Sequence, residues 1–234
     1  MIHNEDCMAT MSRMDDGSVD LIVTSPPYNL RNTTGGGLHS RNSRWGNAAL
    51  KQGYTDHDDM MPHDEYVAWQ RKCLTEMMRV IPDTGAIYYN HKWRVQDGLL
   101  QGREDIMRGF PVRQIIIWQR AGGFNWNQHY YLPTYEVIYL VAKPDFRLAP
   151  GANKHTDIWH ITPDLGTRHP APFPEELARR CISSTDARIV YDPFMGSGTT
   201  AVAAKSLGRV WIGSETSPEY CRIARERLAQ EVLI

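Results

Sequence analysis

The sequence predicts an α/β fold in which short buried strands alternate with helices. Six runs of apolar, β-branched or aromatic residues have the length of strands. Most are apolar at nearly every position, as expected for strands that helices cover on both faces. Helical patterns lie between some of these runs, which is typical of an α/β sheet. The 234 residues suffice for one well-buried core, so we expect a single domain over 1–234.

The expected elements follow in chain order. The predicted strands are 19–24, 86–89, 112–118, 135–142, 189–191 and 210–213. A helix is predicted over 64–80, with acids in its first turn, and a second over 199–207, which stops before Gly208. Ser217 and Pro218 open a third helix as N-cap and first residue. Segments 29–61 and 144–169 are expected to be irregular, and long irregular segments are often functional.

Composition limits the possible functions. The net charge of −1 means that any nucleic-acid binding must rest on local patches. No apolar run approaches the roughly 20 residues that span a bilayer, and the N-terminus does not resemble a signal peptide. Scattered cysteines and no metal-binding motif argue against a disulfide framework or a metal site; the cysteines are Cys7, Cys73, Cys181 and Cys221. We therefore expect a cytoplasmic protein without membrane or metal partners.

A glycine-rich segment, 192–200, follows a predicted strand and precedes a helix. Gly196 and Gly198 permit a tight turn and close approach of a ligand. The helix N-terminus behind them suits the carboxylate of a bound amino acid. The segment lacks the lysine of a phosphate-binding loop, which argues against a nucleoside triphosphate. Glu215 ends the next strand and could bind the ribose hydroxyls of a nucleoside cofactor, although a purely structural glycine turn is the alternative.

A second segment, Ser25-Pro26-Pro27-Tyr28, directly follows the predicted strand 19–24. Two prolines fix the backbone and remove two N–H donors, which leaves carbonyl groups that can face a ligand. Serine and carbonyl oxygens can accept hydrogen bonds from an amino group on a planar base, and the tyrosine ring can stack on that base. The alternative is a turn that proline merely stiffens.

Together, segments 192–200 and 25–28 resemble the amino DNA methyltransferases, which methylate adenine N6 or cytosine N4. The order, with the Ser-Pro-Pro-Tyr segment first, resembles the permuted β class of that family. The resemblance implies a circularly permuted, Rossmann-like, S-adenosylmethionine-dependent methyltransferase fold. Its sheet would be seven-stranded and mostly parallel, with helices on both faces. The C-terminal half would supply the first two strands of the cofactor half-site, and the N-terminus the next two, ending at Ser25.

Further segments match, and the resemblance runs from about residue 2 to 229. Segment 4–7 resembles the one whose acid contacts the cofactor adenine, and 169–174 resembles the motif that packs on the methionine end. The resemblance implies S-adenosyl-L-methionine as cofactor. The implied cofactor-binding residues are Asp6, Cys7, Ser25, His169, Pro170, Phe173, Asp192, Phe194, Gly196, Ser197, Gly198, Thr199, Thr200 and Glu215.

The expected reaction uses Ser25, Pro26, Pro27 and Tyr28 as catalytic residues. Hydrogen bonds to the Ser25 side chain and the Pro26 carbonyl would draw the amino nitrogen toward sp³ geometry and direct its lone pair at the sulfonium methyl. Holding both reactants in line supplies much of the acceleration. The base of a duplex must be flipped to reach the pocket, and Tyr28 would be its stacking platform.

Two loops, 29–61 and 120–131, are expected to contact double-stranded DNA. The first carries basic residues without acids over 29–55, and the second interleaves amide and aromatic side chains. The expected DNA-binding residues are Arg31, Arg41, Arg44, Lys51, Arg120, Asn125, Asn127 and His129. A solvated loop and a packed hairpin are the alternatives. Segment 90–93 could line the pocket or only cap the sheet.

The chain has little room for a target-recognition domain. About 26 residues separate the strand 135–142 from His169, which is too few for such a domain. Recognition would therefore fall to the two loops and to a second subunit, and members of this class are often dimers, so a homodimer is expected.

Several alternatives stay open. Many adenine-specific members have Asp where this chain has Ser25, and Ser is common in cytosine-N4 enzymes. The continuation through Asn29-Leu30 and the small β-class layout favour adenine N6. An RNA or protein-glutamine methyltransferase is disfavoured by the permuted order, and a non-catalytic cofactor- or DNA-binding module by the intact motifs. A role in restriction–modification fits, but the presence of a partner nuclease stays open.

Overall fold

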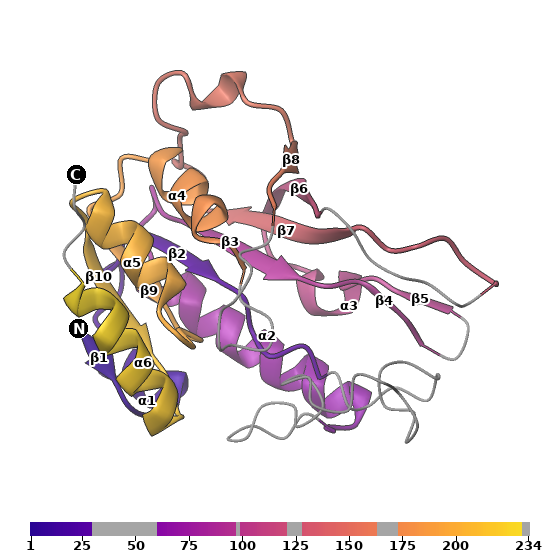
Figure 1. Ribbon diagram of the computed structural model, residues 1–234, viewed down its shortest axis with the longest axis horizontal. Coiled ribbons are helices and arrows are strands. Elements are labelled where there is room, and N and C mark those ends of the chain that lie inside the picture. The colour runs from indigo at the N-terminus through magenta and orange to yellow at the C-terminus, as the bar shows by residue number, and fades with distance from the viewer. Residues whose placement is uncertain (30–59, 97–98, 121–127, 163–172, 231–234) are drawn as a thin grey trace.

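The centre of the molecule is an eight-stranded sheet. The computed structural model describes residues 1–29, 60–96, 99–120, 128–162 and 173–230. The strand order is β1-β10-β9-β2-β3-β7-β6-β8 (Figure 1). The strands are β1 (Ile2–His3), β2 (Leu21–Thr24), β3 (Ala86–His91), β6 (Val112–Gln119), β7 (Tyr135–Ala142), β8 (Ile158–His160), β9 (Ile189–Asp192) and β10 (Val210–Ser214).

The sheet is mostly parallel, as expected. Every neighbouring pair from β1 to β3 is parallel, whereas β7 runs antiparallel to both β3 and β6. The carboxyl ends of β9, β2 and β3 therefore share an edge with the amino end of β7. Open α/β sheets bind ligands at the carboxyl ends of their strands, so this edge is where a site is expected.

The strand order confirms the permuted arrangement. β9 and β10 come from the C-terminal part of the chain, and β1 and β2 from the N-terminus. β1 joins β10 through Ile2 opposite Gly213, and β2 joins β9 through Leu21 opposite Val190. The two ends of the chain therefore meet inside one continuous sheet.

The expected irregular segment 144–169 is partly ordered, which corrects that prediction and adds an eighth strand to the seven expected. Ala152–Lys154 forms a 3-10 turn, and β8 extends the sheet beside β6, with Trp159 opposite Trp118. Trp159 is buried in the core, so tertiary packing stabilises a strand too short to be recognised from its own pattern.

Helices cover both faces of the sheet, as expected. Successive side chains of β2 point to opposite faces: Leu21 and Val23 pack with α4 and α5, and Ile22 packs with α1, α2 and α3. In Figure 1, α4, α5 and α6 (orange to yellow) lie on the opposite face of the sheet from α2. The helices are α1 (Cys7–Met11), α2 (His63–Val80), α3 (Glu104–Met107), α4 (Glu175–Ser183), α5 (Thr199–Ser206) and α6 (Pro218–Ala229).

The three predicted helices are confirmed as α2, α5 and α6. Ser217 is the N-cap of α6 and Pro218 its first residue, but the Ser217 side chain makes no capping hydrogen bond. Helix α4 was not predicted, although its buried residues recur at helical spacing; they are Leu177, Ala178, Cys181 and Ile182.

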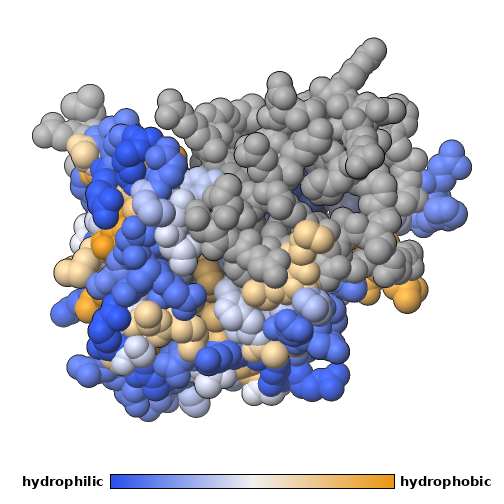
Figure 2. Space-filling model, turned by 90° about the horizontal axis from the view of Figure 1, so that it is seen from below, coloured by the Kyte–Doolittle hydropathy of each residue, from blue (hydrophilic) through white to orange (hydrophobic). Residues whose placement is uncertain are grey.

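A hairpin of β4 (Arg94–Gln96) and β5 (Leu99–Gln101) stands apart from the main sheet. Its Leu99 and Leu100 are exposed. On the face shown in Figure 2, hydrophilic and apolar residues are interspersed among the coloured atoms. No helix in the described ranges is long and apolar enough to cross a membrane.

Candidate functional site

The two sequence motifs meet at the carboxyl edge of neighbouring strands. Segment 25–28 follows β2, and segment 192–200 begins at the end of β9. The Thr24 hydroxyl donates to Asp192 Oδ1 over 2.7 Å, and the Thr200 hydroxyl donates to the Val23 carbonyl over 3.2 Å. All four residues are buried. Two segments that lie far apart in the chain are therefore joined directly.

We call segment 192–200 the glycine loop, and its glycines are required by its backbone. Gly196 and Gly198 have φ values of 51° and 85°, in the left-handed region that favours glycine. A Cβ on Gly198 would also lie 3.0 Å from the Ala224 Cβ, which is closer than ordinary contact. The loop thus turns sharply into α5, and α6 packs against the turn.

Glu215 holds the glycine loop from the end of β10. Its Oε2 accepts a hydrogen bond from the Gly196 N–H, and its Oε1 accepts one from the Ser217 N–H, both at 2.8 Å. Two carboxylate oxygens offer about four acceptor positions. A carboxylate held in this way at a strand end has the chemistry to bind ribose hydroxyl groups.

Asp192 is the buried acid of the glycine loop. Burial raises the pKa of Asp192 to about 6, although hydrogen bonds from Thr24, Thr200 and the Phe194 N–H oppose the shift. The nearby Glu215 adds to the rise. A nearby cation would favour its charged form.

Arg227 of α6 is a site residue that the sequence did not reveal. Its guanidinium donates to the Ser197 carbonyl over 2.8 Å, to the Ser197 hydroxyl over 3.1 Å and to the Thr199 hydroxyl over 3.2 Å. The predicted ligands Ser197 and Thr199 therefore also serve to fasten the loop. No motif marks Arg227, because its contact depends on how α6 packs.

The N-terminal segment lies beside Glu215. The Asn4 amide donates to the carbonyls of Glu215 and Thr216, each over 2.9 Å. Asp6 is exposed and caps α1 by accepting from the Met8 N–H. Cys7 is different, because its side chain is buried in the core, where Cys73 and burial raise the pKa of the thiol. Only the backbone of Cys7 remains available to a ligand.

The aromatic residues expected near the cofactor are packed on core elements. Phe194 makes an edge contact with Trp69 of α2 at a ring distance of 5.7 Å. Phe173 is buried in the cluster that holds α4 against the sheet. His169 and Pro170 lie outside the described residues.

We call segment 25–28 the proline strip, and its tyrosine is buried in a polar network. The hydroxyl oxygens of Ser25 and Tyr28 are 2.6 Å apart. Tyr28 donates to Glu136 Oε2 over 3.0 Å, and the Asn90 amide donates to the Tyr28 hydroxyl over 2.7 Å and to Glu136 over 2.9 Å. Asn90 is the penultimate residue of β3 and Glu136 the second residue of β7, so the segment after β2 and two further strands supply this network. Asn90, the first residue of segment 90–93, therefore contacts the proline strip.

A second network supports the proline strip from α2. The Tyr66 hydroxyl is 2.8 Å from the Pro27 carbonyl and 2.7 Å from His91 Nε2. The Tyr89 hydroxyl donates to Gln70 Oε1, and the amide nitrogen of Gln70 lies 3.3 Å from the Tyr66 hydroxyl. The rings of Tyr28 and His91 lie 4.8 Å apart. The network immobilises the backbone carbonyl that precedes Tyr28.

Charged residues surround the Glu136 end of the site. Arg120 forms an ion pair with Glu136 Oε1 at 3.3 Å. Burial, followed by the proximity of Arg120, lowers the pKa of Lys92. Of the residues expected to bind DNA, Arg120 is thus placed beside the proline strip and His129 is exposed. Arg31, Arg41, Arg44, Lys51, Asn125 and Asn127 lie outside the described residues.

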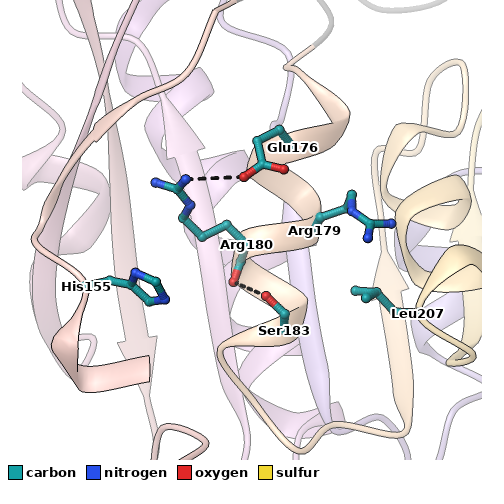
Figure 3. Close-up of a pocket in the computed structure, with 6 residues that line it drawn as sticks. All are labelled: His155, Glu176, Arg179, Arg180, Ser183 and Leu207. Carbon is teal, nitrogen blue, oxygen red and sulfur yellow. Dashed lines mark hydrogen bonds and ion pairs between the residues drawn. The ribbon is translucent and has the colours of Figure 1, made fainter. Parts of the chain in front are cut away.

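A surface pocket on α4 is separate from these motifs (Figure 3). Its lining residues are His155, Glu176, Arg179, Arg180, Ser183 and Leu207. Arg180 is paired with Glu176 and lies over the Trp159 ring, while Arg179 donates to Ser206. Both arginines have partners, and none of the lining residues was a candidate from sequence.

The arrangement places a set of hydrogen-bond acceptors beside a loop suited to a nucleoside. Ser25 and the strip carbonyls can bind an amino group. Glu215 and the glycine loop can bind ribose hydroxyls and a carboxylate. In the part of the chain that the structure describes, no cluster of side chains could hold a metal ion.

Comparison with known proteins gives one family and several relatives. The model of a family described as DNA methylase matches residues 19–226. The type II methyltransferase M.BglII of Bacillus subtilis is 27% identical over 272 residues, which cover 98% of this chain and 69% of that protein.

Solved structures share the fold. TTHA0409 of Thermus thermophilus, in complex with S-adenosyl-L-methionine, superposes with a TM-score of 0.72 at 24% identity and covers 99% of this chain and 94% of its own. The cytosine-N4-specific PvuII DNA methyltransferase has a TM-score of 0.74 at 19% identity, over 100% and 87% of the two chains. At these identities the likeness establishes the fold.

Proposed function

The chain belongs to the DNA methylase family, and on this premise we propose that it transfers a methyl group from S-adenosyl-L-methionine to an exocyclic amino group of a base in duplex DNA. The observation that carries the proposal is the Thr24–Asp192 hydrogen bond of 2.7 Å. Thr24 immediately precedes the proline strip, which suits an amino group, and Asp192 opens the glycine loop, which suits a methyl donor. Methyl donor and acceptor would thus be held side by side.

The residues at the glycine loop fit S-adenosyl-L-methionine. Glu215 places a carboxylate at the end of β10, where an acid suits the ribose hydroxyls, and Asp6 is exposed at the neighbouring strand end, where an adenine would lie. A cationic ligand would favour the charged form of the buried Asp192 carboxyl group. When bound, the cofactor supplies an activated methyl group on a sulfonium.

The proline strip would bind and orient the amino group. The nitrogen is a poor nucleophile because its lone pair is delocalised into the base. Hydrogen bonds from its two N–H groups to Ser25 Oγ and the Pro26 carbonyl would favour sp³ geometry and free that lone pair. Two prolines and the Tyr66 contact to Pro27 hold these acceptors rigidly, so orientation supplies much of the rate. A target within a duplex requires base flipping.

We propose adenine N6 as the target, on the continuation of the strip through Asn29-Leu30 and the small layout of the chain. Cytosine N4 is the second candidate, and Ser25 favours it, since serine at this position is common among cytosine-N4 enzymes. The likeness to the PvuII enzyme agrees with that candidate at the level of fold. Both bases present the same amino group to the strip.

We propose that loops 29–61 and 120–131 contact the DNA and that two copies of the chain form the working enzyme. Arg41→Ala combined with Arg44→Ala should reduce the slope of log affinity against log salt by about two, as expected for two lost phosphate contacts. An unchanged slope would remove these residues from the interface. Light scattering at working concentration should give a dimer, and a monomer would contradict the second part.

The experiment that tests the function is methyl transfer from labelled S-adenosyl-L-methionine by the purified protein. Mass spectrometry of the hydrolysed DNA should yield N6-methyladenine, whereas N4-methylcytosine would establish the second candidate. Parallel reactions with RNA and with protein control for other acceptors, and Ser25→Ala controls for contamination. Label in RNA or protein but not in DNA would overturn the proposal. A type II relative suggests a restriction–modification role, for which protection of the modified DNA from a nuclease is the assay.

A further inference from the structure

A buried carboxylate lies beside the proline strip and takes no part in the reaction described so far. Glu136, the second residue of β7, is only 7% exposed. Its Oε2 accepts from Tyr28 at 3.0 Å and from Asn90 at 2.9 Å, and its Oε1 pairs with Arg120 at 3.3 Å. Buried charges are retained where they are paired and hydrogen-bonded, as this one is.

The carboxylate determines which group donates each hydrogen bond of the network. An ionised carboxylate can only accept. The single hydroxyl hydrogen of Tyr28 therefore points to Glu136. The Tyr28 hydroxyl has no second hydrogen. The hydrogen that lies between the Tyr28 oxygen and Ser25 Oγ, which are 2.6 Å apart, therefore belongs to Ser25. The chain of donors thus runs from Ser25 through Tyr28 to Glu136.

Asn90 obeys the same rule. The atom that faces Glu136 must be the amide nitrogen, because the carboxylate cannot donate to an amide oxygen. The same nitrogen lies 2.7 Å from the Tyr28 hydroxyl oxygen. The amide oxygen of this buried residue then remains as an acceptor, and among the described residues it has no hydrogen-bond partner.

We propose that Glu136 is a positioning residue for methyl transfer, which turns the Ser25 hydroxyl hydrogen inward through Tyr28 so that Ser25 Oγ presents its lone pairs to the exocyclic amino group. The inference rests on the function proposed above. Serine needs such a partner because its hydroxyl can donate as well as accept, and a donor facing the amino group would repel its N–H. An aspartate at this position would accept without assistance.

Glu136→Gln tests the direction of the hydrogen bonds from Ser25 through Tyr28 while it preserves the shape of the side chain. Its amide can donate to Tyr28, which lets the Tyr28 hydrogen turn to Ser25 and the Ser25 hydrogen turn outward. We expect single-turnover methyl transfer to DNA to fall on the order of 10- to 100-fold. The affinity for S-adenosyl-L-methionine should stay within about twofold, because Glu136 does not touch the glycine loop. Circular dichroism and thermal melting check that the variant folds.

Tyr28→Phe and the double variant separate positioning from a structural role. If Glu136 acts through the Tyr28 hydroxyl, the double variant should be no slower than the slower single variant. Losses that multiply, or a wild-type rate for Glu136→Gln, would overturn the proposal. Glu176→Gln, an exposed glutamate of α4, is the matched control and should keep the wild-type rate.

A spectroscopic measurement tests the same hydrogen bonds without catalysis. In protein labelled with ¹³C at tyrosine Cζ, the Tyr28 signal, identified by its loss in Tyr28→Phe, should lie downfield because its hydroxyl donates to a carboxylate. It should move upfield in Glu136→Gln and stay in Glu176→Gln; an unmoved signal in Glu136→Gln would overturn the proposal. If wild-type protein transfers no methyl to DNA while the signal behaves as expected, the proposed function fails and the hydrogen-bond direction stands.

Discussion

The glycine loop and the proline strip follow neighbouring strands but are held in different ways. The glycine loop depends on its own backbone, with left-handed φ values at Gly196 and Gly198 and an N–H that Glu215 binds. The proline strip depends on remote side chains, namely Tyr66 of α2, Asn90 of β3 and Glu136 of β7. Local sequence thus specifies the turn of the first region, which Glu215 and Arg227 then fasten, whereas the second region is held mainly by tertiary contacts.

This difference separates the expected effects of substitution. Changes at the glycine loop should act on cofactor affinity or on the pH dependence of protein stability, because its groups are proposed to bind the nucleoside of the cofactor or, like Asp192, are buried. Changes at the proline strip should act on methyl transfer, because its groups are proposed to bind the amino group of the base. A glycine-loop variant that lost only methyl transfer, or a proline-strip variant that lost only cofactor affinity, would contradict this assignment of roles.

The largest effect is expected for Ser25→Ala, which removes the side-chain acceptor of the strip. Methyl transfer should fall on the order of 10²- to 10³-fold, or about 3–4 kcal/mol of transition-state stabilisation, by analogy with the loss of one oriented hydrogen-bonding group elsewhere. Calorimetry should show nearly unchanged cofactor affinity. Ser183→Ala, at an exposed serine of α4, is the control. Turnover of Ser25→Ala close to wild type would sink the catalytic role.

Asp192→Asn should change how stability depends on pH. Burial raises the folded pKa of Asp192 to about 6, above its unfolded value near 4. Between these values the folded state holds the extra proton, so stability falls as pH rises through about 6. The change is about 3 kcal/mol at 1.36 kcal/mol per pKa unit.

The measurement is denaturant unfolding of wild type and Asp192→Asn at several pH values from 4 to 8. The asparagine has no charge to bury, so the stability of wild type relative to the variant should decline over this range. Asp83→Asn, at an exposed aspartate, should show no such trend. A difference between wild type and Asp192→Asn that does not vary with pH would refute the shifted pKa.

Glu215→Ala should weaken cofactor binding by about 2 kcal/mol, or roughly 30-fold, as expected for the loss of hydrogen bonds to a charged group. Transfer at saturating cofactor should change only a few-fold, because the proline strip is untouched. Glu226→Ala, at an exposed glutamate of α6, is the matched control in calorimetry. Unchanged affinity in Glu215→Ala would remove the residue from the cofactor site.

Tyr66→Phe should have the smallest effect. It deletes the hydroxyl that contacts the Pro27 carbonyl and His91, while it keeps the buried ring. The free energy of unfolding should fall by about 1 kcal/mol, the net worth of a buried hydrogen bond. Tyr131→Phe, at an almost fully exposed tyrosine, should be neutral. A loss of cofactor affinity instead of stability would break the comparison between the two regions.

The long apolar strands and helices were predictable because the spacing of apolar residues within each segment already indicates which residues are buried. β2, β3, β7 and α2 follow directly from such runs. β1 has only two residues and forms because β10 pairs with it, and β8 forms because β6 does. Short strands of this kind depend on pairing with a neighbouring strand that cannot be identified from the local sequence.

Part of the candidate site was also predictable. Ser25, Asp192 and Glu215 belong to motifs whose residue types already imply their chemistry. Glu136 and Arg227 belong to no motif, and each acts only because a strand or helix brings it to a distant segment. Cys7 shows the converse, since its position in a matching segment did not reveal that its side chain is buried in the core.

By itself, the sequence determined the class of fold, the two motifs and the family to which they point, because glycine, proline and apolar periodicity act through local backbone physics. Only the tertiary structure decided that Thr24 binds Asp192 and that Tyr28 donates to Glu136. Those hydrogen bonds depend on strands that are distant in the chain and adjacent in the sheet. Their directions then follow from elementary chemistry, since a carboxylate accepts and a hydroxyl has one hydrogen to donate.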